Sequence, residues 1–130
     1  MATVSGITVA TERGIVQTTW TGFATSGDVG TAEQLSRYPI KNVQIGGTFT
    51  GSPTLVLEGS EDGVTYFTVM AEYVAVVSTA PTAGDAPVTA AAASYFGQLG
   101  TNPRFIRPRC SAGSGGANLF VILTSKAFGN

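Results

Sequence analysis

The stretch NVQIGGTFT, from Asn42 to Thr50, decides the fold class of this chain. From Val43 to Phe49 every second residue is apolar or glycine, and the residues between them are polar or glycine. Alternation with a period of two puts one row of side chains on a buried face and the other toward water, so it predicts a half-buried β-strand. The turn-forming residues Gly51-Ser52-Pro53 follow directly, and they predict that the chain reverses there.

Outward from this stretch, strand-forming residues recur between clusters of Gly, Pro, Ser and Asp. The further segments that we expect to be strands are 15–23, 54–58, 64–70, 72–77, 105–110 and 118–125. The segments 42–50, 54–58 and 64–70 are joined by tight turns, the second of them around Glu61-Asp62-Gly63. These three segments predict an antiparallel meander.

Helical signals are weak, which points to an all-β chain. Segments 31–37 and 90–93 have the composition of a helical turn or two, and 79–87 has that of an exposed loop. The pattern of short strands and frequent turns predicts an all-β antiparallel β-sandwich with little helix, of jelly-roll or immunoglobulin-like topology. With 130 residues, the chain fits one sandwich domain spanning 1–130. Within it, 1–14 is either an N-terminal arm held against a neighbour or an edge strand of the chain's own fold.

The composition is poor in charge. Charged residues make up 12% of the chain and hydrophobic residues 43%. Soluble domains carry about twice that share of charge, so we expect much of the surface to be covered by other subunits, as in a homo-oligomer. Leu119–Leu123 is apolar at every position and needs cover on both faces. This run is too short to span a membrane, and the net charge of −1 lacks a basic run, so neither a membrane nor a nucleic acid is expected as a partner.

Residues suited to acid–base or metal chemistry are scarce. The chain has no histidine and a single cysteine, Cys110. The commonest general base and transition-metal ligand are therefore missing, and an internal disulfide framework is excluded. Glu58, Glu61 and Asp62 gather around a turn, but the spacing lacks the alternating acids and the closing glutamate of a calcium loop. We expect no enzyme activity, no cofactor and no metal site.

Some residues are instead candidate contacts with another chain: Trp20, Arg104, Arg107, Phe120 and Ile122. Arg107 and Arg109 share one face of the 105–110 strand, and the arginine fork is well suited to interfaces. Pairing of these arginines within the chain, with Glu58, Glu72 or another surface acid, is the alternative. Phe120 and Ile122 form one face of the last strand. For Trp20, core packing is the default and an interface anchor the alternative.

Two parts of the sequence carry a resemblance to a known family. The first is QIGGTF (44–49) with TLVLEGSEDGV (54–64) and Tyr66-Phe67; the second is RFIRP (104–108) with the glycine-rich turn and apolar strand after it. This pattern resembles that of small virion structural proteins of tailed bacteriophages, of the capsid decoration (cement) type. The resemblance implies a non-enzymatic β-sandwich that binds the major capsid protein and stabilises the capsid by bridging neighbouring subunits. It also implies a virion location, after synthesis in the cytoplasm of the host bacterium.

Two other roles stay open. One is a carbohydrate-binding or host-recognition module of a tail or spike, for which Trp20, Tyr66, Tyr73 and Tyr95 are candidate aromatic contacts. The other is a head–tail connector or tail-tube subunit, a role that would require rings of defined order.

Overall fold

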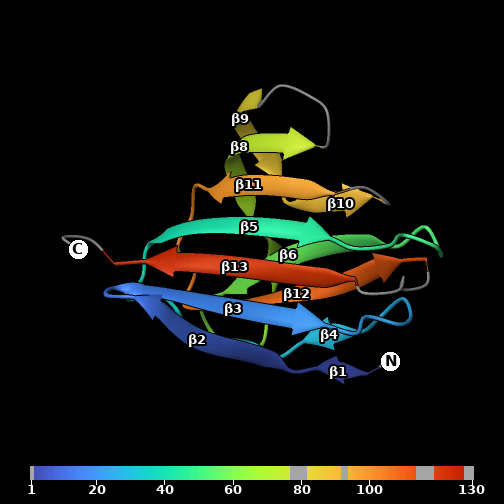
Figure 1. Cartoon of the computed structure of the whole chain (residues 1–130), viewed down its shortest axis with the longest axis horizontal. Helices are drawn as coiled ribbons and strands as arrows, with labels where there is room; N and C mark the ends of the chain where they lie inside the picture. Colours follow the sequence, from blue (N-terminus) through green and yellow to red (C-terminus); the bar gives the residue numbers. More distant parts are fainter. Residues whose placement is uncertain (1, 77–81, 92–93, 114–118, 128–130) are drawn as a thin grey trace.

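Two β-sheets pack face to face in the computed structural model, which describes residues 2–76, 82–91, 94–113 and 119–127 (Figure 1). One sheet has the order β2 (Gly6–Glu12), β3 (Ile15–Thr21), β13 (Phe120–Lys126), β5 (Ile40–Gly46), β11 (Tyr95–Leu99), β8 (Met70–Val76) and β9 (Thr82–Pro87). The other has the order β1 (Thr3–Val4), β4 (Val29–Gly30), β12 (Phe105–Ala112), β6 (Thr54–Ser60) and β10 (Thr89–Ala91), with β7 (Phe67–Thr68) also paired to β6. The predicted all-β sandwich is confirmed, and none of the described residues is helical.

The core lies between the two sheets. It is built from alternate residues of the strands, as the period-two patterns require. Val43 and Ile45 of β5 and Val121 and Leu123 of β13 point into it and are buried. β13 is the centre of the larger sheet, because it pairs antiparallel with β3 on one side and with β5 on the other.

The predicted meander is wrong in its first half. β5 and β6 belong to opposite sheets, so the chain crosses the sandwich between Gly47 and Pro53 instead of forming a hairpin. In this crossover Gly47 has a φ of +119° and Ser52 a φ of +51°, and both angles lie in the region that favours glycine. A turn between two strands and a crossover between two sheets carry the same residue types, and alternation within each strand is the same in both cases. Only β6 and β7 form the expected hairpin.

Three further segments differ from expectation. Residues 31–37 form no helical turn, because Glu33 is extended and pairs with Ile106 through two backbone hydrogen bonds. Of 90–93, the described part belongs to strand β10. Of 79–87, residues 82–87 form the edge strand β9, where a proline is tolerated because no further strand needs its missing N–H. Residues 79–81 and 92–93 lie outside the described part.

The N-terminal segment 1–14, described from Ala2 onward, pairs within the chain's own fold. β1 pairs parallel with β4, and β2 pairs antiparallel with β3. Asp28 anchors its start, since the carboxylate accepts hydrogen bonds from the backbone amides of Ala24, Thr25 and Ala2 at 2.8–3.0 Å. These amides hold the pKa of Asp28 well below its usual range.

A buried lysine anchors the loop that leads into β5. The Lys41 ammonium donates to the carbonyls of Leu35 and Tyr38, at 3.0 and 2.7 Å, and to the side chain of Asn102. Burial lowers the pKa of Lys41 to about 8. These contacts join the loop before β5 to the segment that leads into β12.

Candidate functional site

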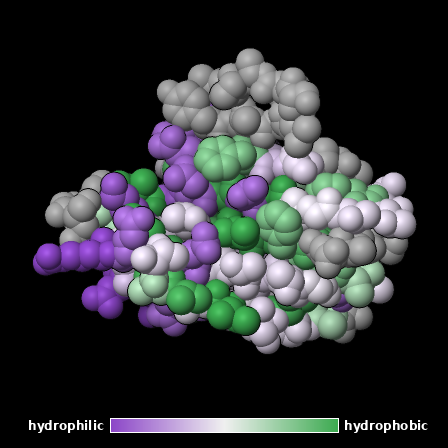
Figure 2. All heavy atoms as spheres, viewed as in Figure 1, coloured by the Kyte–Doolittle hydropathy of each residue, from purple (hydrophilic) through white to green (hydrophobic). Residues whose placement is uncertain are grey.

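The outer face of the larger sheet, the side away from the smaller sheet, carries three apolar side chains in one row, which also contains two polar ones. Pairing between neighbouring strands aligns one residue from each of five strands into what we call the outer row: Ile7, Thr19, Ile122, Gln44 and Phe96. Ile7 is 67% exposed and Phe96 48% exposed, and Ile122 between them is partly exposed. Figure 2 shows apolar atoms (green) in the middle of this face.

The next row along the same strands is polar. It contains Gln17, Thr124, Asn42 and Gln98, which are paired with one another across the sheet, and only Val9 at the edge is apolar. In Figure 2 hydrophilic atoms (purple) gather toward the left end of this face. The outer face is thus divided into an apolar part and a polar part.

Phe120, one of the predicted contact residues, lies on this face beside the outer row. Its ring covers Gly46 of β5, where a Cβ atom would come within 2.6 Å of the ring tip. Glycine at this position therefore lets the ring lie flat on the sheet. Phe120 and Ile122 are partly exposed, while Val121 and Leu123 fill the core. One apolar face of β13 therefore packs in the core, and the other apolar face lies on the outer surface of the larger sheet.

The expected cover for the second face of β13 is a loop or the N-terminal segment of the same chain, or else another subunit. β2 lies beside β3 at the edge of the sheet, so it does not cover the outer face of β13. Residues 73–77 are also apolar at every position, so the sequence predicts that this segment too needs cover on both faces. Their side chains lie outside the described residues.

An Arg–Glu cluster, formed by Glu58, Arg107 and Arg109, lies on the outer face of the smaller sheet. Arg107 donates its Nε–H to Oε1 of Glu58 at 3.2 Å, and Arg109 donates its Nε–H to Oε2 at 2.9 Å. The Glu58 side chain is only 7% exposed, against 27% and 36% for the two arginines. The guanidinium carbon of Arg107 also lies 3.6 Å from the centre of the Tyr66 ring. The alternative of pairing within the chain therefore holds for Arg107.

The remaining predicted contact residues lie apart from each other. Arg104 is exposed, and its guanidinium lies 5.2 Å from the centre of the Phe105 ring. Trp20 is fully buried and donates its indole N–H to the Thr31 carbonyl at 3.1 Å, so it belongs to the core and reaches no surface. The five candidates thus do not form one site: Phe120 and Ile122 share a face, and the two arginines lie on the opposite sheet.

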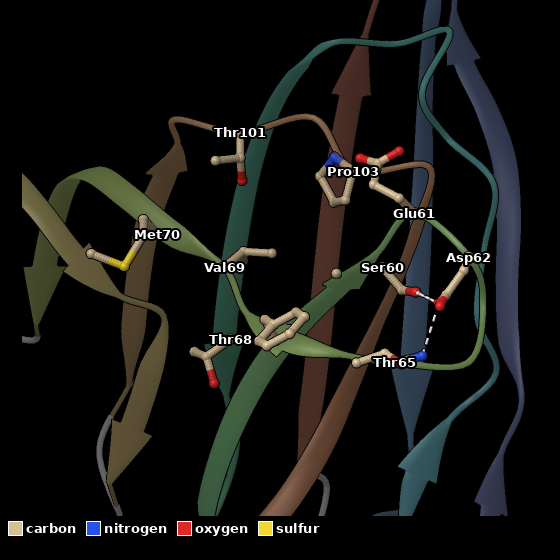
Figure 3. A pocket seen from close by; sticks show the side chains of 11 residues that line it. Ser60, Glu61, Asp62, Thr65, Thr68, Val69, Met70, Thr101 and Pro103 are labelled. Atoms are coloured by element: carbon tan, nitrogen blue, oxygen red, sulfur yellow. Dashed lines mark hydrogen bonds between the residues drawn. The ribbon is translucent and has the colours of Figure 1, made fainter.

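A groove, which we call the end groove, opens beside β7 and was not predicted. It has a volume of about 350 Å³. Its floor is apolar, with Val69 and Pro103 buried, and Phe67 beside them is 72% exposed. Figure 3 shows the carboxylates of Glu61 and Asp62 at one end of the groove and Met70 at the other. The adjacent aromatic residues Tyr66 and Phe67 were the sequence signal for this groove. Neighbouring strand residues point to opposite faces, so one of two adjacent aromatic rings is expected at the surface.

The acidic end of the groove has a fixed geometry. Asp62 accepts hydrogen bonds from the backbone amides of Thr65 and Val64 and from the Ser60 hydroxyl, each at 2.8 Å. These bonds, that of Thr65 first, lower the pKa of Asp62 to about 2. The carboxylate is therefore ionised at neutral pH and holds the loop after β6 in place.

Residues that could ligate a metal ion are not gathered anywhere in the described ranges. No cluster of three or more Cys, Asp or Glu residues there has the geometry to hold a metal ion. Cys110 is buried, and burial raises the pKa of its thiol, which disfavours the reactive thiolate. No helix among these residues is long and apolar enough to cross a membrane.

Comparison with known proteins shows similarity in fold. No protein-family model and no curated protein sequence matches the chain. The crystal structure of the SPBc2 prophage-derived protein YomS aligns with a TM-score of 0.54 and 12% identity, over 90% of this chain and 96% of YomS. KdgF from Halomonas sp. aligns over 95% of this chain and 79% of its own at 14% identity, with a TM-score of 0.24, which is too low to indicate a shared fold. At such low identity the similarity to YomS shows a shared fold.

Proposed function

We propose that this chain is a non-enzymatic structural protein of a bacteriophage particle, which decorates the capsid and stabilises it by bridging neighbouring subunits of the major capsid protein. The phage setting is supported by the similarity in fold to a prophage-derived protein over nearly the whole of both chains. The sequence patterns at 44–67 and 104–108, which resemble those of small virion proteins, are consistent with it.

The main structural support for a decorating role is the outer row. Ile7, Ile122 and Phe96 present apolar surface in one line across a sheet that is rigidly hydrogen-bonded. Such a line on the face of a sheet suits burial against the surface of another protein, and each 100 Å² of apolar area removed from water contributes about 2.5 kcal/mol before the costs of association. A decorating protein needs no cofactor, because it acts only through the area that it buries at subunit junctions.

The test is binding to phage heads that lack the protein. Purified chain should co-sediment with such heads in a saturable way and raise the temperature at which they open. Phe96→Lys places a charge in the outer row at an exposed position and should weaken binding at least tenfold. Phe67→Lys is the matched control, because Phe67 is also exposed but lies at the end groove. Equal binding of the two variants, or no binding of the wild-type chain, would contradict the proposal.

The end groove favours a second candidate function, recognition of a surface carbohydrate. An exposed phenyl ring beside the hydroxyls of Thr68 and Thr101 and the carboxylate of Glu61 offers the aromatic face and the polar acceptors that a sugar ring requires. Of the aromatics expected from the sequence, Trp20 and Tyr95 are buried, Tyr66 is partly exposed beside Arg107, and the side chain of Tyr73 lies outside the described residues. In this groove the role would use Phe67.

Substitutions at Phe67 and Phe96 also distinguish carbohydrate recognition from capsid decoration. For carbohydrate recognition, Phe67→Ala should abolish retention on immobilised host polysaccharide, and Phe96→Ala should leave it unchanged. For the decorating role, Phe96→Ala should weaken binding to phage heads, and Phe67→Ala should leave that binding unchanged.

A further inference from the structure

β2 is an open edge of the larger sheet. It is the outermost strand in Figure 1 and pairs with β3 alone. All residues from Ile7 to Arg13 are exposed, and Ile7 and Val9 on the outer face are 67% and 57% exposed. The backbone N–H and C=O groups on the free side of such a strand form a template for another strand.

The described edges of the two sheets differ in how well they are protected. At the opposite edge of the larger sheet, β9 contains Asp85 and ends at Pro87, two residue types that discourage strand addition. In the smaller sheet, the edge strands β1, β7 and β10 are two or three residues long. β2 is seven residues long, contains no proline, and is uncharged from Gly6 to Thr11. Only its end departs from regular pairing, where the register shifts between Ala10 and Glu12.

We propose that β2 pairs antiparallel with β2 of a second copy of this chain, about a two-fold axis at Thr8. In this register Ile7 lies opposite the partner subunit's Val9, and Val9 lies opposite the partner subunit's Ile7. Two exposed apolar side chains per chain then cover each other on the outer face, the kind of cross-strand pair that stabilises sheets. The paired stretch runs from Gly6 to Ala10 and contains no charge, so no like charges oppose each other.

A second copy fits this edge better than an unrelated strand because the edge is self-complementary. A two-fold interface requires one patch to match itself, and the Ile7 and Val9 positions do so in the Thr8-centred register. The two larger sheets then continue into one, with both outer faces on the same side and the outer row of each subunit offset by one row from that of the other. This pairing involves only copies of this chain and does not depend on binding to a capsid.

Sedimentation velocity of the full chain over a range of concentrations tests the association. We expect a monomer–dimer equilibrium. Val9→Lys should weaken dimerisation at least tenfold, because it brings a charge to the edge against an apolar partner. Gln44→Lys is the matched control: Gln44 is exposed on the same face but lies in the interior strand β5, so the dimer should be unaffected. A wild-type chain that stays monomeric at ~0.5 mM would overturn the proposal, and so would a dimer that Val9→Lys leaves intact.

Disulfide trapping tests the register. Ile7→Cys and Val9→Cys are prepared as separate single variants, and native Cys110 is buried and cannot take part. Under mild oxidation an equal mixture of the two variants should give cross-linked dimers, while each variant alone should give few, because only directly opposed Cβ atoms come close enough. Efficient cross-linking of either single variant, with none gained on mixing, would overturn the Thr8-centred pairing.

Discussion

Arg107 and Glu58 face each other directly across the β12–β6 pair, and Arg109, two residues further along β12, reaches the other oxygen of the same carboxylate. One nearly buried acid thus holds two partly exposed arginines on a sheet face. The arrangement fixes both guanidinium groups by their Nε atoms.

Glu58→Gln tests how much this arrangement stabilises the fold. The variant keeps the shape of the side chain but removes the charge that compensates two arginines. We expect a loss of about 1–3 kcal/mol in the free energy of unfolding, measured by urea denaturation at low salt. Glu61→Gln changes an exposed acid on the adjoining loop and should change the free energy of unfolding by less than about 0.5 kcal/mol. Equal effects of the two substitutions would show that the cluster adds no stability.

Asp28→Asn tests the anchor of the N-terminal strand. The pKa of Asp28 is lowered in the folded state, so its contribution to stability is present above the pKa of the unfolded chain and is lost as the pH falls toward the folded value. The variant should melt at a lower temperature than the wild-type chain at pH 7. This difference should shrink as the pH falls below about 4. A difference in melting temperature that is constant from pH 7 to pH 3 would exclude the ionised carboxylate as its source.

Gly46→Ala tests the contact between β5 and the Phe120 ring. The added Cβ would meet the ring at 2.6 Å, so the ring must swing away from the sheet, at a cost of about 1–3 kcal/mol. In a Phe120→Ala background the same substitution should cost less than about 0.5 kcal/mol, because the obstacle is gone. A double-mutant cycle from thermal melts measures the difference. Additive effects would mean that the ring and the glycine do not interact.

Trp20 provides a test of the core and a probe for the other experiments. Trp20→Ala should cost about 3–5 kcal/mol and leave little folded protein at 37 °C. Trp20→Phe should cost less, since a ring still fills the site but the Thr31 carbonyl loses its donor. The sole tryptophan should emit at short wavelength when folded and shift to the red on unfolding. Emission typical of exposed indole in the native chain would contradict its burial.

The sequence predicted individual strands better than their partners. β3, β12 and β13 lie close to the expected ranges because β-branched and aromatic residues recur in them and turn-forming residues bound them. β11 was missed, since Gly97 occupies an inward position between Tyr95 and Leu99 and removes the apolar signal there. Which sheet each strand joins was not predictable, because alternation identifies a buried face but not the strand beside it.

The candidate contact residues were predicted in part. Ile122 and Phe120 are at the surface, as the two-faced apolar pattern of the last strand indicated. Ile7 and Phe96 were missed, because their place in the outer row depends on the pairing of β2 and β11, which only the structure gives. That any of these residues contacts another chain stays a prediction.

The position of β13 also governs the timing of folding. The strand that separates β3 from β5 is made of residues 120–126, so more than a hundred residues intervene between Ile15 and its partner Lys126. A chain emerging from the ribosome can form the β2–β3 and β6–β7 hairpins early, but β3 and β5 have no common neighbour until residue 126 has been made. Contacts this distant in sequence slow folding and leave apolar strands exposed meanwhile. Truncation of the last strand should therefore yield an insoluble chain and not a smaller sandwich.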